Sequence, residues 1–349
     1  MTWKQQLAAS ITTPEQLAGH FDLDPEPLRE VAARYPLLIT PHYFGLIENP
    51  GDPIWRQCVP DLCELVADDL PEDSLNEQGF APVPAVVHRY PDRALLMVSG
   101  QCAGYCRFCT RKSRVGTSAF CFSPEQIVEG IAFIADSPGI RDVILTGGDP
   151  LLLSDDRLED VMSRLYRIPH VEIIRIGSRV PVTLPDRITS RLCRILSRFQ
   201  PIYLNTHFNH PRELTIESAE ACARLADAGL PLGNQTVLLN GVNDDPAVMI
   251  ELCRGLLKMR VRPYYLHHID QARGTSHFLV PVECGLEIIA GMRGQVSGIG
   301  IPQYVVDPPG GEGKVPLLPE NLLGVGDSLR VQTSLGVVEL PNRRRRDVA

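Results

Sequence analysis

The sequence Cys102-Ala-Gly-Tyr-Cys106-Arg-Phe-Cys109 is the most informative part of this chain. Its CxxxCxxC spacing allows one tight loop to turn three thiolates toward a common point. Thiolates are the usual ligands of iron–sulfur clusters, and a four-iron cluster needs one ligand for each iron. Three cysteines therefore predict a 4Fe-4S cluster in which one iron stays open for another ligand.

The sequence gives less support to other roles for these three cysteines. Structural zinc usually has four protein ligands, often as two CxxC pairs, and the chain has no second pair. A disulfide framework is not expected in a chain this long without a secretory signal. A chance cluster of buried thiols stays open, because free cysteine is often a core residue. The remaining seven are interpreted as core residues or inert thiols: Cys58, Cys63, Cys121, Cys193, Cys222, Cys253 and Cys284.

The composition is that of a soluble globular protein. The chain has 349 residues, 44% of them hydrophobic, and no uninterrupted apolar run as long as a membrane span. A net charge of −8 argues against general nucleic-acid binding, and the basic run Arg343 to Arg346 is interpreted as a solvated tail. The N-terminus lacks the apolar stretch of a signal peptide, so we expect a reducing, cytoplasmic location.

The order of apolar runs and amphipathic stretches predicts the fold class. Six Val-, Ile- and Leu-rich runs alternate with helical patterns, which predicts a parallel sheet with right-handed crossovers. The strands are expected at 94–99, 143–146, 171–176, 202–205, 234–239 and 263–267, and the helices near 124–136, 156–167, 185–199, 212–229, 245–259 and 281–296. Six βα units are too few for an eight-stranded barrel, so we expect an α/β fold with a partial, open (βα)6 barrel.

Three regions follow from this pattern. Residues 1–90 are expected to be a helical and irregular N-terminal region, 91–300 the barrel core, and 301–349 a C-terminal segment with a glycine-rich loop and a tail. Polar motifs stand where the predicted strands end, and ligand sites in such folds lie beyond those carboxyl ends. The cysteines follow the first strand and Thr146-Gly-Gly-Asp149 the second, while Asn205-Thr-His207 ends the fourth and Asp270 follows the sixth.

The glycine-rich loop Asp307-Pro-Pro-Gly-Gly-Glu-Gly-Lys314 contains a second candidate group. A phosphate-binding P-loop is excluded, because position 308 is Pro and Lys314 is followed by Val315. A lysine that attaches a planar cofactor through a Schiff base fits the loop, since glycines leave room for such a group. An exposed loop lysine is the alternative, and the loop alone does not separate the two.

Taken together, the motifs resemble those of known enzymes. The CxxxCxxC loop, with Phe108 before the last cysteine, resembles the signature of radical S-adenosylmethionine (SAM) enzymes, in which the open iron binds the amino and carboxylate groups of SAM. From about residue 30 to 325 the chain resembles the lysine 2,3-aminomutase family. The matching motifs are SGQCAGYCRFCTRKSRVG, TGGDPLL, RIGSRVPVTLP, NTHFNHPREL, GNQTVLLNGVND, RPYYLHHID and YVVDPPGGEGKVP.

The resemblance implies a role for each candidate residue. Lys314 would be the catalytic lysine that carries pyridoxal 5′-phosphate (PLP). The cluster ligands would be Cys102, Cys106 and Cys109. The other cofactor contacts would come from Arg89, Tyr90, Arg93, Phe108, Gly147, Gly148, Asp149, His207 and Gln235, with a polar core role equally open for His207 and Gln235. Arg111 would bind the substrate α-carboxylate, and Asp270 and Asp307 its distal ammonium, because a buried charge needs partners.

The family activity implied for this chain is the interconversion of L-lysine and β-lysine by a 5′-deoxyadenosyl radical, an isomerase reaction with an external donor such as flavodoxin or ferredoxin. Three alternatives stay open: an elongation factor P-type lysine aminomutase, an arginine or glutamate 2,3-aminomutase, and a non-catalytic iron–sulfur electron-transfer protein. The chain has no cysteine after Cys284, so the zinc site at the subunit interface of studied members is not expected. A homo-oligomer without that interface remains possible.

Overall fold

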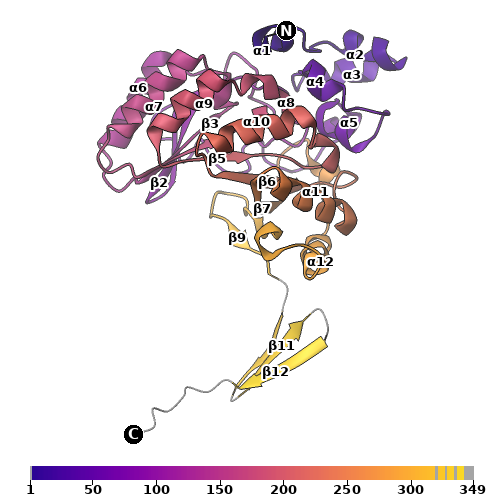
Figure 1. Cartoon of the computed structure of the whole chain (residues 1–349). Coiled ribbons are helices and arrows are strands. Elements are labelled where there is room, and N and C mark those ends of the chain that lie inside the picture. The colour runs from indigo at the N-terminus through magenta and orange to yellow at the C-terminus, as the bar shows by residue number, and fades with distance from the viewer. Residues whose placement is uncertain (1, 319–320, 327, 334–335, 342–349) are drawn as a thin grey trace.

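A nine-stranded sheet in the order β1 to β9 forms the centre of the protein, seen in the computed structural model in Figure 1. The structure describes residues 2–318, 321–326, 328–333 and 336–341. All six predicted strands are present, and they are parallel to one another. They are β2 (Arg93–Ser99), β3 (Asp142–Gly147), β4 (Ile173–Gly177), β5 (Ile202–Thr206), β6 (Leu232–Leu238) and β7 (Val261–His268).

All six predicted helical regions contain helices. These are α6 (Pro124–Ala135), α7 (Asp155–Tyr166), α9 (Ser190–Leu196), α10 (Ile216–Asp227), α11 (Pro246–Lys258) and α12 (Val282–Met292). Two of them begin four or five residues later than predicted. The reason is the same in both, because the Thr189 and Thr215 hydroxyls accept from the backbone N–H groups of Leu192 and Ser218 and so act as N-caps. A short 3₁₀ turn precedes each of these two helices without being continuous with it: Pro185–Arg187 before α9 and Pro211–Glu213 before α10.

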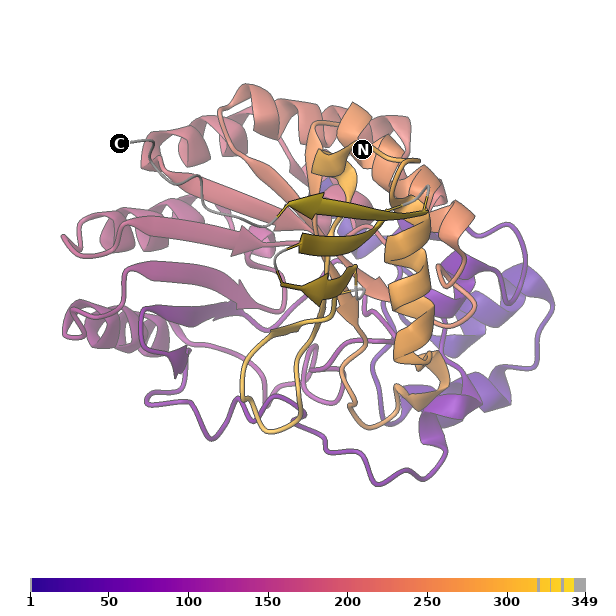
Figure 2. The same cartoon turned by 90° about the horizontal axis from the view of Figure 1, so that it is seen from below.

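The strands are covered on one face rather than on both. In Figure 1 helices α6, α7, α9 and α10 lie above the strands, and Figure 2 looks onto the opposite face. Along β3 and β6 fully buried residues alternate strictly with half-buried ones. Side chains on a strand point alternately to its two faces, so one face packs on the helices while the other lines an open interior. The sheet therefore forms the wall of a cavity.

Short strands that the sequence analysis did not identify extend both edges of this wall. Strand β1 (Val86–Tyr90) pairs antiparallel with β2, and β8 (Gln303–Val306) pairs parallel with β7. The two-residue β9 (Val315–Pro316) then pairs antiparallel with β8. Strands β1 and β9 stand at opposite ends of the strand order. The Tyr90 hydroxyl at the end of β1 nevertheless accepts from the Lys314 backbone N–H just before β9 (3.1 Å), so the curvature of the sheet brings its two edges together.

The N-terminal region packs against the cysteine loop. Its helices are α1 (Trp3–Ala8), α2 (Pro14–Phe21), α3 (Pro25–Ala32), α4 (Pro41–Phe44), α5 (Pro53–Cys58) and the 3₁₀ turn η1 (Leu62–Leu65). The backbone N–H groups of Tyr105 and Arg107 donate to the carbonyls of Leu38 (3.0 Å) and Gln57 (2.9 Å). These bonds hold the cysteine loop from outside the barrel. The division of the chain at residue 90 stays a prediction.

A second, three-stranded antiparallel sheet was not predicted. It consists of β10 (Leu322–Val325), β11 (Ser328–Thr333) and β12 (Gly336–Pro341), and it stands apart from the main sheet in Figure 1. The basic run at 343–346 lies outside the described residues. Within the described part of the chain, no helix combines the length and apolarity needed to cross a membrane.

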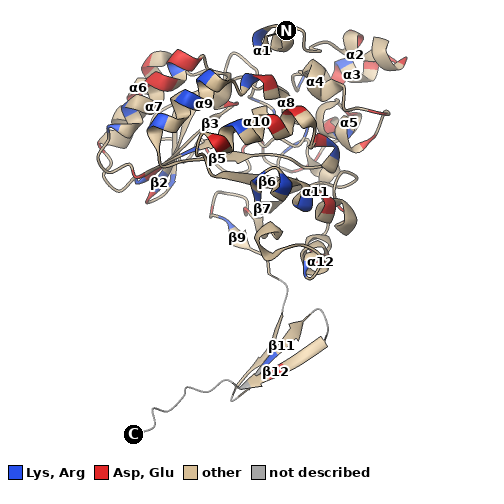
Figure 3. Ribbon diagram, viewed as in Figure 1, with Lys and Arg blue, Asp and Glu red and all other residues tan. Residues whose placement is uncertain are grey.

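Charged residues of both signs are spread over the outer helices (Figure 3). On α7, Arg164 pairs with Asp160 one turn earlier at 2.9 Å, and Arg191 of α9 pairs with Asp156 of α7 at 2.5 Å. All four side chains are largely exposed. Such pairs contribute little to the stability of the fold, because water and salt screen them. They show an outer surface of mixed charge over these helices.

Candidate active site

The three loop cysteines follow β2 and lie close enough to influence one another. Burial, with Asp149 and the other two thiols nearby, raises the pKa of Cys102 well above its usual value, and burial with Cys106 nearby raises that of Cys109 to about 11. Among the described residues, no group of three His, Cys, Asp or Glu side chains is arranged for a single metal ion. In a four-iron cluster each thiolate binds a different iron, so the three cysteines are not required to surround one ion.

A buried charge network fixes the backbone of this loop. The Arg107 guanidinium donates twice to Glu64 of η1 (2.5 and 3.1 Å at Oε2), and Lys112 donates to the same carboxylate at 2.6 Å. All three side chains are almost fully buried. Burial lowers the pKa of Lys112 to about 8, although Glu64 opposes that shift. Because unpaired charges would be costly here, the network ties the loop to the N-terminal region.

The glycines after β3 accommodate the chain's own backbone. A side chain at Gly148 would place its Cβ 2.4 Å from the Gln101 carbonyl, and Gly147 has φ +121° with Ser99 equally close. The buried Asp149 carboxylate accepts from the Ser178 hydroxyl (2.8 Å) and from backbone N–H groups. The pair Gly147–Gly148 is thus needed for the cysteine loop to pack on β3. Their expected contact with SAM stays a prediction.

A cavity of about 310 Å³ opens inside the curved sheet. Its wall includes seven of the predicted site residues, which come from β1, β2, the cysteine loop, β6 and the loops around β8 and β9. They are Arg89, Tyr90, Arg93, Arg111, Gln235, Asp307 and Lys314. The structure therefore gathers residues more than 200 positions apart around one space. The cysteines, Phe108, Gly147, Gly148, Asp149, His207 and Asp270 are not part of this cavity wall.

Lys314 occupies one end of the cavity and forms an ion pair with Asp307. Arg89 donates to the other oxygen of the same carboxylate at 3.2 Å, and the Asp307 side chain is almost fully buried. The Tyr90 hydroxyl accepts from Arg89 (3.1 Å) and from the Lys314 backbone (3.1 Å). The Arg93 guanidinium lies 4.9 Å from the Tyr90 ring centre. Two guanidiniums and an ammonium around one aromatic ring suit a planar, phosphorylated ligand.

Asp270 follows β7 and has a buried carboxylate oxygen, Oδ1, without a hydrogen-bond partner. Burial raises the pKa of this carboxyl to about 7, with Asp307 adding to the shift and Lys314 opposing it. His267, also near Lys314 and Asp307, has its pKa lowered to about 3 by burial and by the Lys314 charge. A buried carboxylate without a partner is costly, so the surroundings of Asp270, which feel the charges of Lys314 and Asp307 at the cavity wall, are suited to a further cation.

Arg111 enters the cavity with most of its donors already used. Its Nε donates to both oxygens of Glu77 (2.8 and 3.0 Å), and Nη1 donates to the Gly147 carbonyl (2.9 Å) and to Thr146 Oγ1 (3.3 Å). Burial alone would raise the pKa of Glu77, but Arg111 and Arg114 outweigh it and lower that pKa. Glu77 also lines the cavity. Glu77 was not predicted as a site residue, because only its contact with the distant Arg111 connects it to the site.

Phe108, within the cysteine loop, packs against His207, with ring centres 5.4 Å apart. The His207 Nε2 atom is buried without a partner, and burial with the Arg179 charge lowers its pKa well below the usual value. Phe108 is buried against Phe278. An unpartnered ring nitrogen beside the cysteines fits the expected cofactor contact of His207 better than a satisfied core role.

Comparisons with known proteins agree with this arrangement. The profile of the radical SAM superfamily matches residues 96–253, and that described as lysine-2,3-aminomutase matches residues 289–335. The L-lysine 2,3-aminomutases of Acetoanaerobium sticklandii and Fusobacterium nucleatum are 49% and 48% identical to this chain, over 92% of it and over 79% and 77% of their own lengths. The chain belongs to the lysine 2,3-aminomutase family. Glutamate 2,3-aminomutase of Clostridioides difficile is 44% identical over 96% of this chain and 81% of its own.

In this member of the lysine 2,3-aminomutase family, the cavity wall also includes residues to which the sequence assigned no role. The cavity wall also contains Arg175, Asn205, Tyr264 and Tyr265. The rings of Tyr264 and Tyr265 lie 3.9 Å apart. Asn205 belongs to the polar motif predicted at the end of the fourth strand, and Arg175 lies near the end of the third, but neither was assigned a specific role.

Proposed function

We propose that the protein is an L-lysine 2,3-aminomutase, an isomerase that interconverts L-lysine and β-lysine. The observation that carries the choice of lysine is the pair of nearby carboxylates Asp307, in the cavity wall, and Asp270, behind it, with a buried Asp270 oxygen that has no partner. A substrate whose side chain ends in an ammonium would pair with these carboxylates. The names of the relatives at 48–49% identity support the same substrate.

The residues present fit the three expected cofactors. Cys102, Cys106 and Cys109 would hold a 4Fe-4S cluster, whose open iron would bind SAM. Lys314 would attach PLP, with Arg89 as the forked donor to its phosphate. When bound, the cluster and SAM supply radical chemistry that removes and returns a hydrogen atom, and PLP supplies an aldehyde that carries the migrating amino group.

The chain's own residues then bind, orient and shield the substrate. Arg111, held in place by Glu77, would bind the α-carboxylate, and Asp270 and Asp307 the ammonium, so that both ends of lysine are fixed. Lys314 would leave its ion pair with Asp307 when it attaches PLP, which frees that carboxylate for the substrate. Holding both ends orients the α and β carbons, and the enclosed wall limits access of water to reactive groups.

A glutamate 2,3-aminomutase is the second candidate, because such an enzyme is among the relatives. Its substrate would bring a carboxylate toward two aspartates, which like-charge repulsion disfavours. Arginine would suit the aspartates, and an elongation factor P-type aminomutase would share the lysine chemistry. We further propose a cytoplasmic enzyme with an external one-electron donor, a barrel core at 91–300 flanked by the regions 1–90 and 301–349, and assembly as a homo-oligomer.

Anaerobic incubation of the reduced, cofactor-loaded enzyme with SAM and each of L-lysine, L-arginine, L-glutamate and L-alanine tests the proposal. Products would be separated by chromatography and compared with β-amino acid standards. We expect β-lysine to form fastest. Faster turnover of glutamate would refute the lysine assignment, and absence of PLP absorbance near 420 nm together with no turnover would favour an electron-transfer protein.

A further inference from the structure

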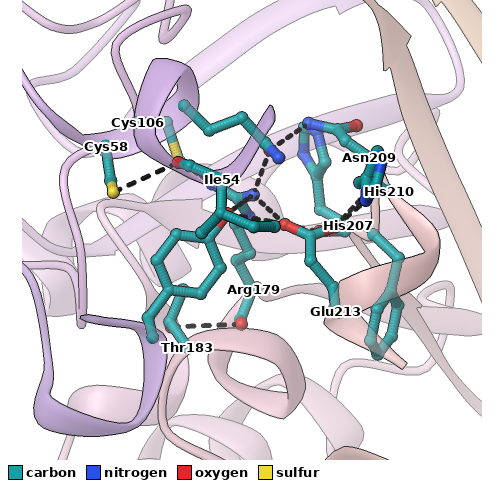
Figure 4. A network of polar contacts seen from close by, with 12 residues as sticks. Ile54, Cys58, Cys106, Arg179, Thr183, His207, Asn209, His210 and Glu213 are labelled. Atoms are coloured by element: carbon teal, nitrogen blue, oxygen red, sulfur yellow. Dashed lines mark hydrogen bonds and ion pairs between the residues drawn. The ribbon is translucent and has the colours of Figure 1, made fainter. Parts of the chain in front are cut away.

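The guanidinium of Arg179 contacts one of the loop cysteines directly (Figure 4). Arg179 follows β4, and its Nη1 donates to the sulfur of Cys106 at 2.7 Å. The side chain is 11% exposed. Arg179 is not part of the cavity wall that holds the substrate and PLP candidates. Its contact is therefore with the proposed cluster ligand and not with the proposed amino acid site.

The rest of the Arg179 side chain is held from several parts of the chain. Its Nη2 donates to Tyr43 Oη (3.0 Å), Gln57 Oε1 (2.6 Å) and Glu213 Oε1 (2.8 Å), and its Nε donates to the His207 carbonyl (3.2 Å). Partners on α4, α5 and the loops after β5 thus fix the plane of the guanidinium. A planar group fixed at two nitrogens has its third nitrogen fixed too. The direction of Nη1 toward Cys106 is set before any cluster binds.

The carboxylate that balances Arg179 is itself fully bonded. Glu213 is completely buried and accepts from Tyr43 Oη (2.6 Å) and from the backbone N–H groups of Asn209 (2.5 Å) and His210 (3.0 Å) (Figure 4). With Arg179, four donors hold this carboxylate in place. Arg179 therefore points a charged N–H donor, Nη1, at the Cys106 sulfur, while its Nη2 is paired with the Glu213 carboxylate.

We propose that Arg179 is a positioning residue that donates a hydrogen bond to the Cys106 thiolate and raises the reduction potential of the 4Fe-4S cluster. Hydrogen bonds to ligating sulfurs and nearby positive charge stabilise the extra electron of a reduced cluster, and both act strongly where water is excluded. The inference rests on the proposed function insofar as it requires the cluster in this loop. It concerns the ease of reduction by an outside one-electron donor, not the choice of substrate.

A redox titration of the reconstituted, SAM-free enzyme with dithionite, followed by electron paramagnetic resonance, tests this role. In Arg179→Met we expect the equilibrium constant for one-electron reduction to fall about tenfold, which corresponds to 59 mV. Arg212→Met is the matched control. Arg212 lies beside Glu213 and pairs with Asp52 at 2.8 Å without contacting the sulfur, so the same loss of charge should leave the potential unchanged.

Removing Arg179 alone leaves Glu213 buried and unbalanced, so the double variant Arg179→Met/Glu213→Gln is titrated beside it. Wild-type enzyme labelled with ¹⁵N in its arginine guanidino groups provides a measurement that needs no variant. We expect the reduced cluster to show a ¹⁵N hyperfine coupling that the double variant lacks. The inference would be overturned if the coupling is missing from wild type or survives in the double variant. A folded Arg179 variant with the wild-type reduction potential would overturn it too. Absence of a four-iron cluster from wild type, by iron and sulfide analysis, would instead refute the proposed function.

Discussion

Replacing Asp270 by Asn should stabilise the substrate-free protein and impair it as an enzyme. The pKa of Asp270 is raised from 3.8 to about 7 by burial, so the folded protein holds a proton there that the unfolded chain has released. Stability from this group is therefore present at low pH and is lost as the pH rises to 7. At 1.36 kcal/mol for each pKa unit, the full cost of the ionised form is about 4 kcal/mol, an upper bound.

The stability half of this prediction is measured by chemical denaturation of the PLP-free protein between pH 6 and 8. About nine-tenths of the Asp270 carboxyls are protonated at pH 6 and about one-tenth at pH 8, so wild type should lose about 1.4 kcal/mol more than Asp270→Asn across that range. Comparing the two proteins cancels the titration of other groups. Asp227→Asn, an exposed residue paired with Arg260, is the control that should follow wild type.

The activity half has the opposite sign. The amide cannot pair with an ammonium as a carboxylate does, and loss of one charge-assisted bond costs about 2–5 kcal/mol, or about 30- to 5,000-fold in kcat/KM for lysine. In wild type the KM for lysine should fall up to about tenfold from pH 6 to 8 as Asp270 ionises, and in Asp270→Asn this dependence should vanish. An Asn variant that is less stable at pH 8 and keeps the wild-type KM would refute the reasoning and make Asp270 structural.

Three further predictions concern the other parts of the site. Alanine at any of the three loop cysteines should abolish iron binding and SAM cleavage, whereas alanine at the exposed Cys121 should leave the iron content unchanged; iron analysis and 5′-deoxyadenosine release distinguish them. In Lys314→Ala, borohydride should no longer attach PLP covalently to the protein, but the iron–sulfur spectrum should remain, because the two cofactors have separate ligands. A covalent PLP adduct retained in this variant would show that PLP is attached to another residue. Glu77→Gln should weaken the anchoring of Arg111, lower stability by about 3 kcal/mol and raise the KM of lysine and arginine alike; a change in their ratio would contradict this.

Local sequence was sufficient for the parallel core and for the presence of two separate cofactor motifs. The six strands were visible as apolar runs, and the helix predicted near 124–136 is α6, which begins at Pro124 with a capping box at Ser123. The cysteine spacing and the glycines around Lys314 indicated separate cofactor groups, because spacing and backbone freedom are local properties. Their joint interpretation relied on resemblance to a family, which the comparisons confirm.

Tertiary structure decided which groups face one another. Arg89 and Lys314 are 225 positions apart, and only the short edge strands β1 and β9 bring them to the same carboxylate. Nothing in the local sequence indicated that Glu77 pairs with Arg111 or that Glu213 pairs with Arg179. An acidic residue has the same sequence context whether it is solvated or buried against a guanidinium. Burial also sets the pKa of Asp270, and burial is a property of the packed cavity. Sequence patterns report local spacing, whereas the electrostatics of this site depend on distances between segments that only folding defines.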